Sequence, residues 1–218
     1  MKCFGYTIVI CFIMMLASSC HTNRYTPFKF DNGPDYVVNG YYRIVDKNGS
    51  IGYADSLGNT TIKPNFAFGL PFNPAGQARV TYTGERKQDG EHWLWESNDW
   101  FYIDTKGNKL KDDDVVVFMC PDIQPQFPGG YAAMFDFIYK NLKIPSSCNY
   151  INGKIIMEFV VTEDGKVENV KIKRSASPEL DKELVHIIEH FPDFLPGTIN
   201  GYPVRSLFTL PLNIRFQD

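Results

Sequence analysis

The sequence lacks the features that mark nucleic-acid-binding proteins and many enzymes. Its formal net charge is −3 and it carries no block of basic residues, so nothing in its charge favours nucleic acid as a partner. It has no G-x-S-x-G motif, no glycine-rich loop for phosphate and no pair of carboxylates suited to acid–base catalysis. We therefore expect a protein that is not an enzyme and that uses no cofactor.

The sequence also lacks an apolar run long enough to cross a bilayer. The run from Ile8 to Ala17 follows Lys2 and falls short of the about 20 residues that a spanning helix needs. The segment Leu16-Ala17-Ser18-Ser19-Cys20 resembles the lipobox of bacterial lipoproteins, with the leucine one position further from Cys20 than is usual. We expect residues 1–19 to be a signal peptide and Cys20 to carry the lipid. The alternatives are simple secretion after cleavage behind Ser19 and a retained membrane helix.

Cysteine is scarce, and its positions are spread along the chain. Cys3 and Cys11 lie in the expected signal peptide, and Cys20 is the expected lipid site. Cys120 and Cys148 then remain as an even pair in an oxidising compartment. They form either a disulfide bond or two free thiols, because a sequence does not supply the Cα separation that a disulfide demands.

The C-terminal part of the chain contains a β-hairpin pattern. Apolar residues alternate on one face from Ile155 to Val161, and the turn Glu163-Asp164-Gly165 follows. Val170 and Ile172 then resume the apolar face, whereas Val167 lies out of phase with them. We therefore expect a bulge near Glu168.

A third strand is expected from Val204 to Phe216, where the even positions are apolar except Ser206. Pro211 lies inside this strand, and a proline cannot donate a hydrogen bond to a sheet ladder. The strand is therefore expected at the edge of the sheet.

Two apolar stripes at helical spacing flank the hairpin. They consist of Tyr131, Met134, Phe135, Ile138 and Leu142 before it, and of Leu180, Leu184, Ile187, Ile188 and Phe191 after it. An isolated hairpin is marginal in water, so we expect both helices to cover its apolar face. The predicted fold is an α+β domain over residues 129–218, with two helices on a three-stranded antiparallel sheet, preceded by a linker at residues 121–128.

Several short motifs between residues 122 and 217 occur in the order typical of one known family. They are Gln126-Phe127-Pro128-Gly129-Gly130, Asn141-Leu142-Lys143-Ile144-Pro145, Gly153-Lys154, Asp164-Gly165-Lys166-Val167, Leu180-Asp181-Lys182-Glu183 and Asn200-Gly201-Tyr202-Pro203-Val204. With them the region resembles the TonB C-terminal domain. Two positions depart from the family, which usually has tryptophan in place of Phe194 and lysine in place of Leu195.

The resemblance implies a function in peptide recognition. Such domains add an extended peptide of an outer-membrane transporter to the edge of their sheet. On this sequence the matching edge consists of Val204, Arg205, Leu207, Thr209, Asn213 and Arg215. The alternative is an edge that only covers the core and is protected from pairing by its proline and arginines.

The motor connection of a TonB energy transducer is not found in the sequence. Such a protein has an inner-membrane helix coupled to a proton-driven motor and a long proline-rich spacer. The apolar run here has no ionisable residue of the kind that proton coupling needs, and no such spacer follows. An energy transducer with a retained N-terminal helix is the alternative.

Residues 20–120 predict a small, mainly-β region of successive hairpins. Three D-x-x-G turns occur, at Asp46-Lys47-Asn48-Gly49, Asp55-Ser56-Leu57-Gly58 and Asp104-Thr105-Lys106-Gly107. The stretch from Gly52 to Ala78 resembles one WG repeat, with Tyr53 at the position of the family's aromatic residue. An irregular small β domain is the alternative.

Two further patterns have a functional and a structural interpretation. Trp93, Trp95 and Trp100 predict either a patch that binds glycan or peptide, or the packing of a small β core, which we favour. The segment from His186 to His190 has the H-x-x-E-H spacing of zinc peptidases, with Glu189 between the histidines. No further ligand motif follows, so we expect a solvated helix face and no metal.

The sequence thus predicts a periplasmic protein of a Gram-negative bacterium, anchored by lipid to the outer rather than the inner membrane. It would bind an outer-membrane transporter or another envelope protein through its sheet edge, as an accessory to transport. The other hypotheses are an envelope adaptor that binds a ligand through residues 20–120 and, least favoured, a zinc hydrolase.

Overall fold

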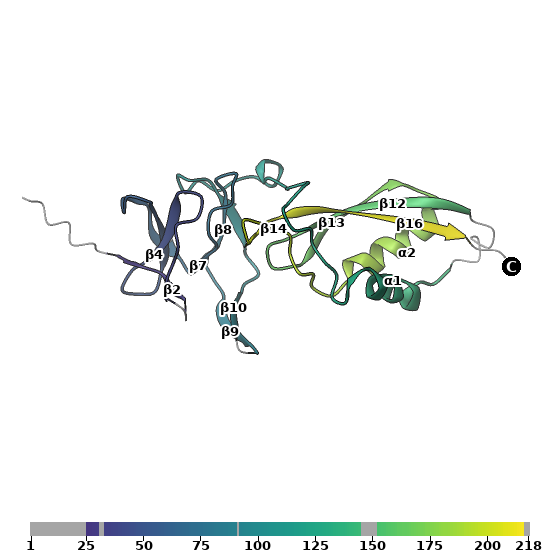
Figure 1. Ribbon diagram of the computed structural model, residues 1–218, viewed down its shortest axis with the longest axis horizontal. Helices are drawn as coiled ribbons and strands as arrows, with labels where there is room; N and C mark the ends of the chain where they lie inside the picture. Colours follow the sequence, from purple (N-terminus) through teal and green to yellow (C-terminus); the bar gives the residue numbers. More distant parts are fainter. Residues whose placement is uncertain (1–24, 31–32, 91, 145–151, 216–218) are drawn as a thin grey trace, which may run out of the picture.

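The computed structural model describes residues 25–30, 33–90, 92–144 and 152–215, and every structural statement below refers to these residues. A β-rich N-terminal region and a C-terminal domain with two helices lie end to end along the long axis of the molecule (Figure 1). The expected α+β class with a β-rich N-terminal region is therefore confirmed. No helix in these ranges has the length and apolar character that a membrane crossing requires.

The N-terminal region is built from antiparallel strands. Its four-stranded sheet has the order β1-β4-β5-β6, its three-stranded sheet has the order β11-β8-β7, and two hairpins add β2-β3 and β9-β10. The strands are β1 Thr26–Pro27, β2 Lys29–Phe30, β3 Gly33–Pro34, β4 Tyr41–Val45, β5 Ile51–Asp55, β6 Thr60–Phe66, β7 Phe68–Gly69, β8 Ala78–Thr81, β9 Glu85–Asp89, β10 His92–Glu96 and β11 Phe101–Ile103. Their shared core contains Ile51, Tyr53, Phe66, Phe72, Val80 and Ile103.

The predicted D-x-x-G turns close with one repeated pattern of hydrogen bonds. In the first, the Asp46 carboxylate accepts the N–H groups of Asn48 and Ser50, both at 2.9 Å, and Gly49 has a φ of 86°. Glycine adopts this left-handed backbone conformation without steric cost because it has no Cβ atom. The turns at Asp55 and Asp104 repeat this pattern.

The C-terminal domain has a three-stranded antiparallel sheet of order β13-β12-β16, so β12 is central. The elements of this part are η1 Asp112–Asp114, α1 Gly130–Asn141, β12 Asn152–Val161, β13 Val167–Arg174, α2 Pro178–Glu189, β14 Thr198–Ile199, β15 Tyr202–Pro203 and β16 Ser206–Arg215. A bulge lies where the sequence predicted one, because Glu158 and Val160 face Lys171 and Glu168, which leaves one extra residue on β13.

One face of this sheet carries the core, and both helices cover it (Figure 1). Residues alternate along β16, with the even-numbered side chains buried and the odd-numbered ones half-buried or exposed. The core joins the sheet to both helices and includes Met134, Ile138, Met157, Phe159, Leu184, Ile188, Phe208 and Leu210.

One face of the first helix, α1, is more exposed than predicted. Met134 and Ile138 are buried, but Tyr131 is 63% exposed and Phe135 is 40% exposed. These two residues form a second stripe with Tyr139, at a spacing of four, which periodicity alone did not separate from the buried one. The expectation that the whole stripe covers the hairpin was therefore wrong for Tyr131 and Phe135.

Residues 121–128, the expected linker, lie in contact with the C-terminal domain. Ile123 forms a bridge with Thr198, and Gln126 forms one with Leu195. Phe127 is buried in the domain core. The main chain of this segment is hydrogen-bonded to the domain that follows it.

Candidate partner-binding edge

The main-chain groups of β16 define which part of this strand is open to a partner. Phe118 lies on the side opposite β12, where its N–H donates to the Arg205 carbonyl at 2.9 Å and its carbonyl accepts from Leu207 N–H at 3.0 Å. Residues with the same parity point the same way in an antiparallel strand. The N–H and C=O groups of Thr209 and Asn213 therefore face outward.

The open stretch runs from Thr209 to Asn213. Within the described ranges, no strand pairs with this side of β16 beyond the single residue Phe118. Pro211 occupies an outward-facing position, so its missing N–H costs no hydrogen bond to β12. The stretch thus offers main-chain N–H donors at Thr209 and Asn213. Pro211 between them offers only its carbonyl oxygen as an acceptor.

The other predicted edge residues lie elsewhere. Val204 precedes β16 and is fully buried. Arg205 binds Glu168 through Nη1 and Oε2 at 2.7 Å. Burial alone would lower the pKa of Arg205, but the Glu168 carboxylate and the Tyr102 hydroxyl together outweigh burial and raise it. Arg205 and Leu207 thus lie where Phe118 already pairs, and the free edge is narrower than predicted.

A shallow groove runs beside the open stretch. It has a volume of about 100 Å³ and is lined by Phe135, Ile138, Tyr139, Leu142, Leu184, Leu212, Asn213, Ile214 and Arg215. At the other end of α1, the ring of Tyr131 lies 6.1 Å from that of Phe208. The exposed aromatic stripe of α1 therefore follows β16 along its length.

The spacing of this stripe suits an extended peptide. Four helical residues rise about 6 Å, and two strand residues rise about 6.8 Å. A strand added to β16 would therefore direct alternate side chains toward Tyr131, Phe135 and Tyr139 in turn. Apolar residues at those alternate positions would cover exposed aromatic surface.

The remaining predicted sites contribute nothing to this edge. Cys20 and Cys148 lie outside the described residues, so lipidation and the disulfide stay predictions, and Cys120 is exposed. The rings of His186 and His190 lie 4.3 Å apart, and both side chains are exposed. The described part of the chain has no group of three or more His, Cys, Asp or Glu residues placed to hold a metal ion.

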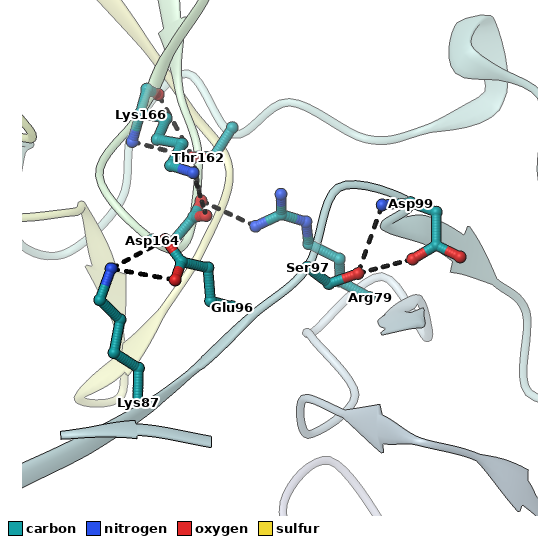
Figure 2. Close-up of polar contacts among 8 residues, drawn as sticks. All are labelled: Arg79, Lys87, Glu96, Ser97, Asp99, Thr162, Asp164 and Lys166. Atoms are coloured by element: carbon teal, nitrogen blue, oxygen red, sulfur yellow. Dashed lines mark hydrogen bonds and ion pairs between the residues drawn. The ribbon is translucent and has the colours of Figure 1, made fainter. Parts of the chain in front are cut away.

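The sequence did not reveal the polar contacts that join the two regions. Arg79 of β8 binds Asp164 of the β12–β13 turn at 2.7 Å, as Figure 2 shows. Tyr102 of β11 donates its hydroxyl to Glu163 at 2.7 Å. These pairs span 85 and 61 residues, so no local pattern could have predicted them.

Comparison with known families assigns the C-terminal part of the chain. Residues 146–217 match the family described as Gram-negative bacterial TonB protein C-terminal. This part of the chain is thus similar to TonB C-terminal domains, and the match includes β12, β13, α2 and β16 but not α1. No curated protein and no solved structure matches the chain.

The two departures from the family occupy different environments. Phe194 is buried and packs its ring against those of Phe159 and Phe208, at 5.7 and 5.5 Å. An aromatic residue of the core is thus retained. Leu195 is exposed, although its main chain is paired with that of Gln126.

Proposed function

We propose that this protein is a lipid-anchored accessory of transport across the outer membrane. Its C-terminal domain would bind an extended segment of an outer-membrane transporter by adding it to β16 between Thr209 and Asn213. A TonB-like role in envelope transport is what the family match suggests. Strand addition at this stretch is our more specific proposal.

The open stretch of β16 is the observation that carries the proposal. An edge strand with outward N–H and C=O groups is a template for another strand. Thr209, Asn213 and Arg215 are exposed, and the groove beside them is lined by α1. Main-chain hydrogen bonds would supply affinity, and the aromatic stripe of α1 would select apolar residues at alternate positions.

A crosslinking experiment in cells tests this proposal. A photoreactive amino acid replaces Asn213 in the full-length chain, and mass spectrometry identifies the crosslinked segment. We expect an extended segment on the periplasmic side of an outer-membrane transporter. A second substitution, Thr209→Pro, removes an outward N–H without removing a hydrogen bond to β12, and it should abolish this crosslink.

Thr209→Val is the matched control, because it changes the same side chain but keeps the main-chain N–H. It should crosslink as well as the parent protein. Adducts that persist equally in the Thr209→Pro and Thr209→Val proteins would rule out strand addition at this stretch.

The membrane anchor is proposed from Cys20 and needs a separate test. The intact mass of the membrane-bound protein should correspond to a lipidated chain that begins at Cys20. The Cys20→Ala protein should lack this mass and the outer-membrane location. An unprocessed chain in the inner membrane would favour the energy transducer with a retained helix.

A further inference from the structure

A cavity lies where the N-terminal region meets the β12–β13 turn. Its volume is about 590 Å³, within the range of about 300–1,000 Å³ typical of ligand sites. The N-terminal region supplies Phe68 and three tryptophans, and the C-terminal domain supplies Glu163, Asp164 and Tyr202. The cavity shares no residue with the open stretch of β16.

Its aromatic wall is formed by Trp93, Trp95 and Trp100, all half-buried. Trp95 stacks on Phe68 with ring centroids 5.2 Å apart and an interplanar angle of 6°. The tryptophans therefore both pack on the core of this region and line the cavity. The two interpretations of the tryptophan cluster are thus compatible with each other.

The charges around the cavity disfavour an ionic ligand. The guanidinium of Arg79 lies over Trp100 at 4.9 Å and that of Arg86 over Trp93 at 4.1 Å, so a cationic ligand beside these rings would be repelled by two positive charges. An anionic ligand would meet the carboxyl groups of Asp35, Glu163 and Asp164. The ligand that fits these walls is neutral.

The polar groups of the wall also disfavour a purely apolar ligand. Arg79 is buried, and among the described residues only its Nη1 finds a hydrogen-bond acceptor, the Asp164 carboxylate. Its remaining N–H groups would be desolvated without compensation beneath an apolar ligand.

A recess that shares lining residues with the cavity provides further support. This recess of about 70 Å³ shares Arg79, Glu163 and Tyr202 with the main cavity and is also lined by Asn73. Asn73 is 7% exposed, and its Nδ2 has no hydrogen-bond partner among the described residues. A buried donor of this kind is uncommon in a folded protein and calls for a ligand or water.

We propose that this cavity binds a short, neutral oligosaccharide. A sugar ring presents an apolar C–H face to an indole, and hydroxyl groups around its edge that both donate and accept hydrogen bonds. The tryptophans would stack on the ring faces, Arg79 would donate to hydroxyl oxygens, and Glu163 and Asp164 would accept from hydroxyl groups. This site is independent of the proposed transporter contact.

Titration with sugars tests the assignment. The chain has 3 tryptophans and all of them line the cavity, so intrinsic tryptophan emission reports on this site alone. The full-length protein is titrated with neutral di- to tetrasaccharides of the maltose, cellobiose and chitobiose series, with calorimetry in parallel. We expect saturable binding of at least one series.

Two conservative variants and one control locate the site. Arg79→Lys keeps a positive charge beside Asp164 but loses the planar guanidinium group with its several N–H donors. This variant should weaken binding about tenfold. Tyr202→Phe removes the hydroxyl of another lining residue and should also weaken binding. Thr209→Pro, which blocks the transporter edge, should leave sugar binding unchanged.

Three results would overturn the proposal. They are the absence of saturable binding by every sugar in the panel, equal affinities of the parent, Arg79→Lys and Tyr202→Phe proteins, and a response only to the neutral apolar dye N-phenyl-1-naphthylamine. The last result would assign an apolar ligand instead.

Discussion

Glu163 and Asp164 are neighbours in the chain, yet folding shifts the pKa values of their carboxyl groups in opposite directions. Burial raises the pKa of Glu163 above its ordinary value. Burial alone would raise the pKa of Asp164 too, but the Arg79 guanidinium and the Thr162 hydroxyl outweigh it and lower the pKa. The contacts of Asp164 with Arg79 and Thr162 thus leave Glu163 as the more readily protonated of the two acids.

This difference predicts a pH-dependent effect of Glu163→Gln. A carboxyl group whose pKa is raised on folding binds more protons in the folded chain, so stability falls as pH rises from the unfolded pKa through the folded pKa. Glutamine keeps an acceptor for the Tyr102 hydroxyl and carries no charge. We expect the variant to unfold at a higher temperature than the parent at about pH 8, and this advantage to shrink toward about pH 4. Equal unfolding temperatures at every pH would contradict a raised pKa at Glu163.

Sequence reasoning at this scale predicted the turns but not the partners of their side chains. The D-x-x-G pattern predicted three turns because an aspartate at the first position binds main-chain N–H groups two and four residues later. It missed the same arrangement at Asn73, whose Oδ1 accepts from Ala75 and Gln77. An N-x-x-G search would have found that turn.

At the scale of elements, β16 combines an open edge with a proline, Pro211, that limits pairing with other strands. Pro211 removes one outward N–H from the stretch that is otherwise free, and edge prolines protect sheets against unwanted pairing. The proline and the proposed partner site are therefore compatible, because donors remain on both sides of it.

Pro211→Thr should strengthen pairing at this edge. The variant gains an outward N–H between Thr209 and Asn213, so we expect self-association at concentrations where the parent protein is monomeric. Sedimentation velocity measures this directly. The double variant Thr209→Pro/Pro211→Thr keeps one proline in the stretch and should behave like the parent. Identical sedimentation of all three proteins would show that the proline does not protect the edge.

Strand periodicity predicted the hairpin, the third strand and the bulge, because alternating burial along a strand appears in the sequence as alternating apolar and polar residues. The outer stripe of α1 was not predicted, because spacing shows which residues share a helix face but not what covers them. Tyr131 and Phe135 were assigned to the core for this reason, and they lie beside the β16 edge instead.

At the scale of the whole molecule, polar contacts link the N-terminal region to the C-terminal domain. The Arg79–Asp164 pair has side-chain exposures of 9% and 36%, whereas the Lys87–Glu96 pair within the β9–β10 hairpin has 58% and 51% (Figure 2). Solvent screens the second pair much more than the first. The two pairs are therefore suited to a direct comparison.

Double-mutant cycles should give different coupling energies for these pairs. Alanine substitutions of Arg79 and Asp164, singly and together, should give a coupling of about 1 kcal/mol in urea unfolding, and those of Lys87 and Glu96 about 0.3 kcal/mol. A coupling near zero for Arg79 and Asp164 would contradict a stabilising contact between the regions. The sequence could not predict this contact, because residues 85 positions apart have no shared periodicity.

The most direct test of strand addition at β16 measures amide hydrogen exchange at Thr209 and Asn213, with and without the transporter segment that crosslinks to the protein. We predict rapid exchange of both amides in the free protein and strong protection in the complex, with little change at Leu210, whose N–H already faces β12. Unchanged exchange at Thr209 and Asn213 in a saturated complex would contradict strand addition at β16.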